Sequence, residues 1–190
     1  MTFTDVSRSD YFYEPVLYLY CRGVISGYAD GTFRPYNNTT RAQLAKIVVL
    51  GFGLSIYTPP TPTFRDVPPT DTFYPYIETA YHSNLVSGYT CGGQGEPCPG
   101  LYFRLGNQVT RGQLSKIVVL AAGWPLLDPP TPTFRDVPKG SPFFRYVETA
   151  YARGIISGYS CGEGCLEFRP GSSATRGQIC KIVYLAITRI

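Results

Sequence analysis

Three arginines occupy equivalent places in a nine-residue pattern that the chain repeats. The pattern reads Thr-Arg-small-Gln-x-x-Lys-Ile-Val and begins at Thr40, Thr110 and Thr175. Its cations are Arg41, Arg111 and Arg176. A guanidinium group donates two parallel hydrogen bonds, a geometry that suits the recognition of a carboxylate. The pattern therefore indicates a specific anionic partner at three similar places, and one hypothesis is that this partner is a ligand.

An ion pair inside the protein is the alternative for these arginines. Each repeat opens with Phe-x-Asp-Val, and the acids of that motif are Asp5, Asp66 and Asp136. The two hypotheses can hold together, because an aspartate can orient the arginine that meets a ligand. We therefore treat the three aspartates as candidate binding residues as well.

A helix must position each arginine. Thr followed three residues later by Gln forms a capping box, in which the Thr hydroxyl and the Gln side chain satisfy free backbone amides. Apolar residues follow at helical spacing, as in Leu44, Ile47 and Val48. The arginine lies in the first turn, near the positive end of the helix dipole. Its recurrence there indicates a specific partner.

The chain is a threefold repeat, with boundaries predicted at 1–57, 58–127 and 128–190. Each copy holds the Phe-x-Asp-Val entry, a first helix (roughly 73–83 in the second copy), a short apolar link ending in Ser-Gly-Tyr, and the Thr-Arg helix. One unit of this size has little core of its own, whereas three can share one. We expect a mainly α fold of helix–turn–helix repeats with short extended segments.

The six cysteines include two close pairs in Gly-rich loops, Cys91 with Cys98 and Cys161 with Cys165. Such pairs predict local disulfides and an extracellular, oxidising compartment. A zinc site with four cysteine ligands is the alternative, although neither pair has C-x-x-C spacing. Cys21 and Cys180 remain, and a disulfide between them would join the first and third repeats.

Composition excludes several classes of function. With 44% hydrophobic and 16% charged residues the chain is globular, and its net charge of +4 is mild. No apolar run is long enough to span a bilayer, and no basic–aromatic cluster indicates nucleic acid. One histidine, His82, and no paired-carboxylate or phosphate-loop motif give no catalytic, metal or cofactor site. No signal peptide precedes Phe3, so an exported protein would have lost its leader or be part of a longer chain.

The motifs, taken in order, resemble the S-layer homology (SLH) repeat of bacterial surface proteins. They are Phe-x-Asp-Val, a helix, Gly-Val-Ile-Ser-Gly-Tyr-Ala-Asp-Gly-Thr-Phe-Arg-Pro at 23–35, and Thr-Arg-Ala-Gln. The resemblance implies a three-lobed, pseudo-threefold helical module with the Thr-Arg helices near its centre. It also implies grooves between repeats that bind a secondary cell-wall polysaccharide, often an anionic one, with Arg41, Arg111 and Arg176 as groove cations. The family's Glu is Gln here, at Gln43, Gln113 and Gln178.

Two hypotheses for function follow, both non-catalytic and both at the cell surface. In the first, the module anchors noncovalently to cell-wall polysaccharide through its grooves. In the second, the same repeats assemble with their own copies into a surface layer, tube or filament, because the sequence holds nothing besides the repeats. The Pro-Pro-Thr-Pro-Thr runs at 59–63 and 129–133 are candidates for O-glycans on Thr.

Overall fold

The computed structural model describes residues 3–189, and helices are the main regular structure within them. Three helices carry the Thr-Arg pattern, and we call them the inner helices: α2 (Arg41–Gly51), α4 (Arg111–Ala121) and α6 (Arg176–Thr188). The others are the outer helices: α1 (Tyr13–Cys21), α3 (Tyr74–His82) and α5 (Phe144–Ala152). The predicted mainly helical class is confirmed. In the described residues, every helix is too short or too polar to cross a membrane.

All three inner helices begin with the predicted capping box. In α2 the Gln43 amide donates to the Thr40 hydroxyl, while the Gln43 side chain accepts from the Thr40 amide. The same reciprocal pair opens α4 and α6. Because the arginine is the first helical residue, the cap fixes where its side chain leaves the helix.

The outer helices end where the sequence predicts. Gly23, Asn84 and Gly154 follow their last turns with φ of 70°, 57° and 67°. This left-handed conformation satisfies the last carbonyls of a helix and turns the chain into the apolar link. The link then leads directly toward the inner helices.

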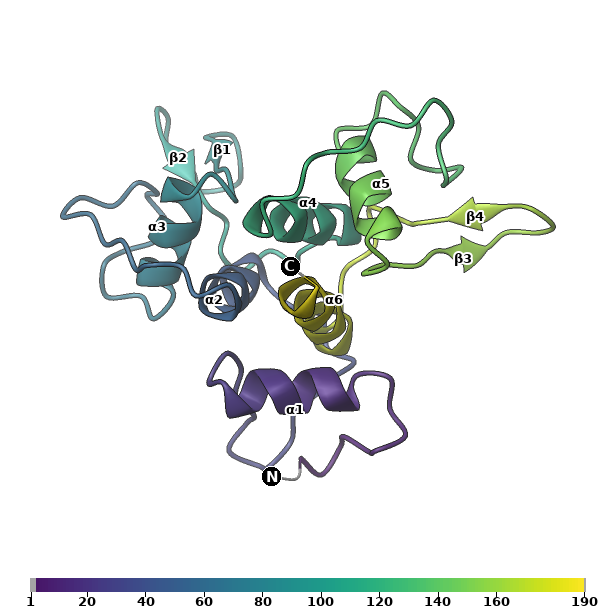
Figure 1. The fold of residues 1–190 in the computed structure, drawn as a ribbon. Helices are drawn as coiled ribbons and strands as arrows, with labels where there is room; N and C mark the ends of the chain where they lie inside the picture. Colours follow the sequence, from purple (N-terminus) through teal and green to yellow (C-terminus); the bar gives the residue numbers. More distant parts are fainter. Residues whose placement is uncertain (1–2, 190) are drawn as a thin grey trace.

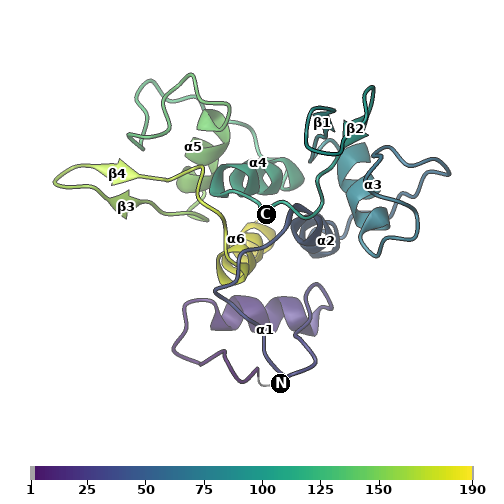
Figure 2. The same ribbon diagram turned by 180° about the vertical axis from the view of Figure 1, so that it is seen from behind.

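Packing joins helices of different repeats. The inner helices contact one another, and each packs against the outer helix of the following repeat, α2 on α3 and α4 on α5. The last inner helix, α6, packs on α1, so the third repeat closes onto the first. Figures 1 and 2 show the inner helices gathered around the middle, with α1, α3 and α5 outside them. Neighbouring repeats therefore share the core, as expected for a repeat protein.

Backbone hydrogen bonds close a ring at the start of the inner helices. The Thr39 amide donates to the Ala174 carbonyl (3.1 Å), Ala174 to Val109 (2.9 Å), and Val109 back to Thr39 (2.9 Å). The first free amides of each inner helix also donate across repeats, as from Arg41 to the Asn107 carbonyl (2.8 Å). Amides that a helix leaves unsatisfied are thus bonded to another repeat.

In the second and third repeats, a hairpin with a disulfide takes the place of the tight turn at 29–32 in the first repeat. Strand β1 (Tyr89–Thr90) pairs antiparallel with β2 (Leu101–Tyr102), and β3 (Tyr159–Ser160) with β4 (Leu166–Glu167). The predicted disulfides Cys91–Cys98 and Cys161–Cys165 are both formed. Figure 1 shows the β3–β4 hairpin extending away from the helices.

The hypothesised disulfide between Cys21 and Cys180 is wrong, because both are free thiols. Cys21 is exposed at the end of α1, whereas Cys180 is buried in α6. Ala45 and Ser115 occupy the equivalent buried position in α2 and α4. The place therefore requires a small side chain, and the size of Cys180 explains its presence.

Replacing Cys91 and Cys98 together by Ser is expected to lower the free energy of unfolding by about 2 kcal/mol. The disulfide closes a loop with a sequence separation of 7, and losing it returns conformational freedom to the unfolded chain. Urea unfolding followed by circular dichroism measures the change. Cys21→Ser is the control, since that thiol is free and exposed. An unchanged midpoint in the double variant would show that the hairpin is not part of the cooperative unit.

The Thr/Pro linkers are held against the outer helices. The Thr63 amide and hydroxyl donate to the two carboxylate oxygens of buried Glu78 (2.8 and 2.7 Å), and Thr133 does the same with Glu148. A buried carboxylate needs such donors. These two hydroxyls are engaged, so O-glycosylation stays a prediction for exposed threonines such as Thr61 and Thr131.

Candidate functional site

Each pattern arginine reaches into the next repeat and holds two backbone carbonyls. The Nε of Arg41 donates to the Phe103 carbonyl (2.9 Å) and its Nη2 to the Ser87 carbonyl (2.9 Å). Arg111 makes the same contacts with Phe168 and Ser157, and Arg176 makes them with Phe33 and Ser26. The side chains are nearly buried, with 7% to 8% of each arginine exposed. Ser87 belongs to the Ser-Gly-Tyr link, and Phe103 to the Phe-Arg turn that follows it.

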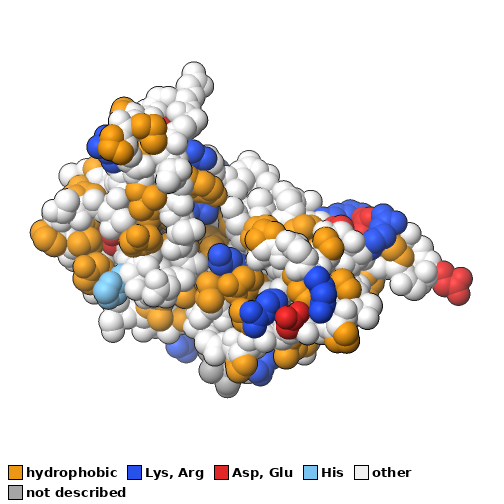
Figure 3. Space-filling model, turned by 90° about the horizontal axis from the view of Figure 1, so that it is seen from above, with side chains coloured by type: hydrophobic (Ala, Val, Ile, Leu, Met, Phe, Trp, Pro, Cys, Tyr) orange, Lys and Arg blue, Asp and Glu red, His pale blue; other side chains and the backbone are white. Residues whose placement is uncertain are grey.

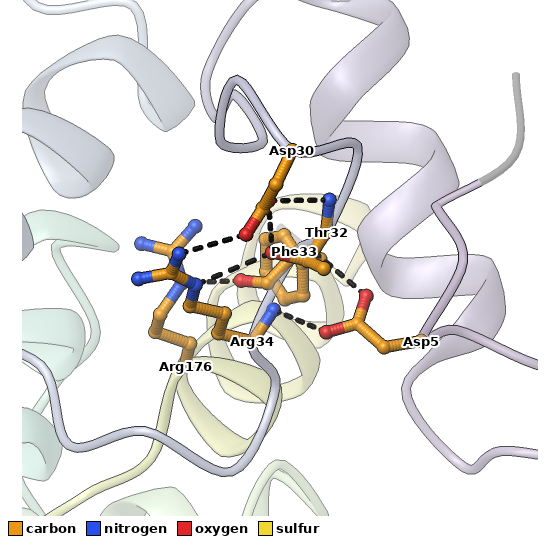
Figure 4. Close-up of polar contacts among 6 residues, drawn as sticks. All are labelled: Asp5, Asp30, Thr32, Phe33, Arg34 and Arg176. Carbon is orange, nitrogen blue, oxygen red and sulfur yellow. Dashed lines mark hydrogen bonds and ion pairs between the residues drawn. The ribbon is translucent and has the colours of Figure 1, made fainter.

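The recurrent aspartates hold the other side of the same turn. The carboxylate of Asp66 accepts from the amides of Phe103 (2.7 Å) and Arg104 (2.6 Å). Asp5 and Asp136 bind Phe33–Arg34 and Phe168–Arg169 in the same way. Figure 4 shows Phe33 between Asp5 and Arg176, which come from opposite ends of the chain. The turn needs this support because Arg34, Arg104 and Arg169 adopt φ of 56° to 60°.

The direct ion pair between these arginines and aspartates is not formed in residues 3–189, where each arginine meets neutral carbonyl oxygens instead. Burial lowers the pKa of the Arg41 and Arg111 guanidinium groups, although arginine stays protonated at any ordinary pH. Desolvating a cation without a counter-ion costs free energy. An incoming anion would offset that cost.

A tyrosine from the Ser-Gly-Tyr link lies beside each arginine and contacts a second one. The Arg41 guanidinium lies 5.0 Å from the ring centre of Tyr89, and that of Arg104 lies 4.5 Å away. Tyr28 and Tyr159 make the equivalent pairs of contacts. Cation–π attraction of this kind holds ring and guanidinium together. The second set of arginines was missed from the sequence, although Phe-Arg recurs in every copy.

This second set differs from the first in having carboxylate partners. Arg34 pairs with Asp30 (2.9 Å), Arg104 with Glu96 (2.9 Å) and Arg169 with Glu167 (3.5 Å). Glu167 is shared, because Arg135 also pairs with it at 2.6 Å. By contrast, Arg41, Arg111 and Arg176 form no salt bridge with a carboxylate within residues 3–189.

Three grooves are built on one plan, and each takes residues from all three repeats. One repeat supplies the Ser-Gly-Tyr link together with Gln, Lys and Ile of its inner helix, the preceding repeat supplies the arginine, and the following repeat supplies an aromatic residue. We number the grooves after the repeat that supplies the link. The charged, amide and aromatic residues that follow this plan are Tyr28, Gln43, Lys46, Phe73 and Arg176 in the first groove, Tyr89, Gln113, Lys116, Phe143 and Arg41 in the second, and Tyr159, Gln178, Lys181, Tyr11 and Arg111 in the third.

The grooves are cationic. Their volumes are about 150, 630 and 240 Å³ for the first, second and third. Each is lined by one arginine and one lysine, and by no acidic residue among those that the structure describes. Three of the chain's four lysines lie here. The face in Figure 3 shows Lys and Arg side chains among hydrophobic ones, with few acidic groups. Such a lining favours an anionic ligand with some apolar surface.

The glutamines keep their capping role and also line the grooves. The Gln113 amide nitrogen donates to the Tyr89 hydroxyl (3.2 Å). Because glutamine is neutral, the cap is preserved without a negative charge beside Arg41 and Lys116. The aspartates Asp5, Asp66 and Asp136 lie outside the linings of these three grooves.

Three curated bacterial proteins have sequences similar to this chain: one is named as an enzyme, one as a cell wall protein and one as a surface layer protein. An endoglucanase of Bacillus sp. (strain KSM-635) is 26% identical over 99% of this chain, the middle cell wall protein of Brevibacillus brevis 27% over 85%, and a surface layer protein of Brevibacillus choshinensis 28% over 70%. The chain spans only 19%, 13% and 11% of their lengths.

A family model matches the chain in three segments, one in each repeat. The model is that of the S-layer homology domain, and it matches residues 2–45, 63–94 and 133–180, together more than half of the chain. Each segment begins at or just before a Phe-x-Asp-Val entry. The chain therefore belongs to the S-layer homology domain family.

Proposed function

We propose that the three grooves bind an anionic polysaccharide of the bacterial cell wall and so attach this chain to the cell surface without catalysis. The observation that carries the proposal is that each of the three grooves holds a lysine and a buried arginine that pairs with no carboxylate of residues 3–189. Family membership and relatives named as cell wall and surface layer proteins support a cell-surface role. The cyclic packing supports a three-lobed, pseudo-threefold module.

A carboxylate-bearing sugar fits this chemistry. Two hydrogen bonds already orient each guanidinium, so its remaining Nη1 can meet an anion without losing further side-chain entropy. The lysine adds a second positive charge, and the link tyrosine offers a ring against which a sugar can lie. We infer that the aspartates act as positioning residues for the groove wall.

Three similar grooves on one module favour a polymer over a free sugar. A chain with repeated acidic residues can occupy a second groove at the high effective concentration set by the first. Modest affinity in each groove then gives firm attachment. We expect the three grooves to differ in affinity, because their volumes differ.

Replacing Lys46, Lys116 and Lys181 together by Gln is expected to remove most binding to cell-wall sacculi while leaving the fold intact. Each lysine lies 5.3 to 5.6 Å from a tyrosine ring centre, a contact that contributes little to stability when exposed. Loss of one charge is expected to weaken each groove by roughly fivefold, about 1 kcal/mol, and the loss multiplies across grooves. Co-sedimentation with sacculi from a Gram-positive bacterium measures it.

Lys139→Gln is the matched control, because this fourth lysine lies outside the three grooves and pairs with Asp128 at 3.7 Å. Sacculi stripped of their secondary polysaccharide should bind neither the wild-type protein nor the Lys139→Gln control. Undiminished sedimentation of the triple variant would exclude the grooves as the binding sites. Electron microscopy of the protein alone tests the alternative of self-assembly: ordered tubes or sheets without sacculi would support it.

A further inference from the structure

Two exposed tyrosines, one lining the third groove and one beside it, have no tyrosine counterparts at the other two grooves. Tyr11 is 52% exposed and Tyr36 is 70% exposed. Tyr11 corresponds to Thr72 and Pro142 in the later repeats, and Tyr36 corresponds to Gly106 and Gly171. The pair is therefore a property of this groove alone and not of the shared plan.

The two rings flank a common support. Both pack edge-on against Phe12, with centroid distances of 4.9 Å for Tyr11 and 5.7 Å for Tyr36 and interplanar angles of 77° and 81°. Phe12 is fully buried, whereas its counterparts Phe73 and Phe143 are partly exposed. Phe12 also lies against Gly177 at the start of α6, where a Cβ atom would come within 2.8 Å of its ring. The support is thus anchored to the helix that lines the third groove.

Tyr11 connects this pair to the groove itself. It lines the third groove with Arg111, Gln178 and Lys181, and the Lys181 ammonium lies 5.3 Å from its ring centre. Burial, followed by the nearby Tyr36 hydroxyl, raises the pKa of Tyr11, and the Tyr159 hydroxyl contributes in the same direction. Tyr159 and Tyr11 thus line the third groove, and Tyr36 lies beside it on the Phe12 ring that also supports Tyr11.

We propose that Tyr11 and Tyr36 form a stacking subsite that binds a neutral sugar ring next to the acidic sugar held in the third groove. This inference rests on the proposed function. Exposed aromatic rings present an apolar face, and the C–H face of a sugar ring covers such a surface well. Covering Phe12 does not explain the pair fully, because both rings remain largely exposed. The third groove thus has a neighbouring subsite that the other two grooves lack.

The test compares two synthetic probes by titration calorimetry. One is the methyl glycoside of a sugar that carries a pyruvyl ketal, and the other is the same acidic sugar extended by one neutral sugar. We expect the disaccharide to bind about tenfold tighter than the monosaccharide at one of the three sites and equally at the other two. Tyr36→Gly, which installs the glycine of the later repeats at a position outside the groove lining, should remove this gain and leave monosaccharide binding unchanged.

A reciprocal variant protects the test against a folding defect. Thr72→Tyr with Gly106→Tyr rebuilds the pair beside the first groove, where a Cβ atom on Gly106 meets no atom within 4 Å. It should create a second site at which the disaccharide binds tighter. Equal binding of both probes by the wild-type protein at all sites would overturn the stacking subsite and leave the proposed function standing. Failure of both probes to bind would overturn the two together.

Discussion

Replacing Arg176 by Ala is expected to lower the free energy of unfolding by about 3 kcal/mol, besides weakening anion binding in the first groove. The side chain donates to the Phe33 carbonyl (2.9 Å) and the Ser26 carbonyl (3.1 Å), and it is 8% exposed. Its loss leaves two poorly hydrated acceptors without donors, at roughly 1–3 kcal/mol for a buried one. Urea unfolding followed by circular dichroism measures the stability, and titration with the acidic sugar measures the binding.

Arg176 is the informative member of the three because its bonds close the module. They join residues separated by 143 and 150 positions, and α6 packs on α1 at the same place. Arg8→Ala is the control, since Arg8 is exposed. Loss of binding with unchanged stability would mean that the arginine serves the ligand alone. A separate early transition would mean that the first and third repeats unfold independently.

Local features of this fold were predictable because their causes lie within a few residues of sequence. The capping box at Thr40, the stop at Asn84 and the disulfide Cys91–Cys98 all follow from short-range patterns, and all are confirmed. The assignment to a mainly helical repeat fold has the same origin. Recurrence strengthened these predictions, because the capping box and the helix stop occur in all three repeats and the close cysteine pair in two.

The partners of Arg41, Arg111 and Arg176 could not be predicted in this way. They are backbone carbonyls, and every residue has one, so sequence carries no signal for which is used. The recurrent aspartates suggested a side-chain partner, yet recurrence shows only that each repeat needs the residue. The structure reveals that arginine and aspartate hold one turn from opposite sides. The Tyr11–Tyr36 pair was missed for the opposite reason, because it occurs once and falls outside the repeat pattern.

Replacing Asp66 by Ala is expected to destabilise the protein by about 3 kcal/mol and to weaken anion binding in the second groove, which Asp66 does not line. Its carboxylate accepts from the amides of Phe103 (2.7 Å) and Arg104 (2.6 Å), and hydrogen bonds to a charged group contribute about 1.5–3 kcal/mol each. Without them the turn relaxes from its left-handed conformation and moves the carbonyl that holds Arg41. Thermal unfolding and calorimetric titration measure the two effects.

Two variants separate a positioning role for Asp66 from a direct one. Asp66→Asn keeps one acceptor oxygen and should lower the free energy of unfolding by about half as much as Asp66→Ala does. Asp128→Ala removes an exposed carboxylate 3.7 Å from Lys139 and should leave the free energy of unfolding almost unchanged. If Asp66 contacted the sugar directly, Asp66→Ala would reduce affinity without lowering the unfolding midpoint. If it positions the turn, affinity and stability fall together, and Asp66→Asn lies between wild type and Asp66→Ala in both. The correlation of the two losses across the series is therefore the decisive measurement, because a ligand contact predicts none.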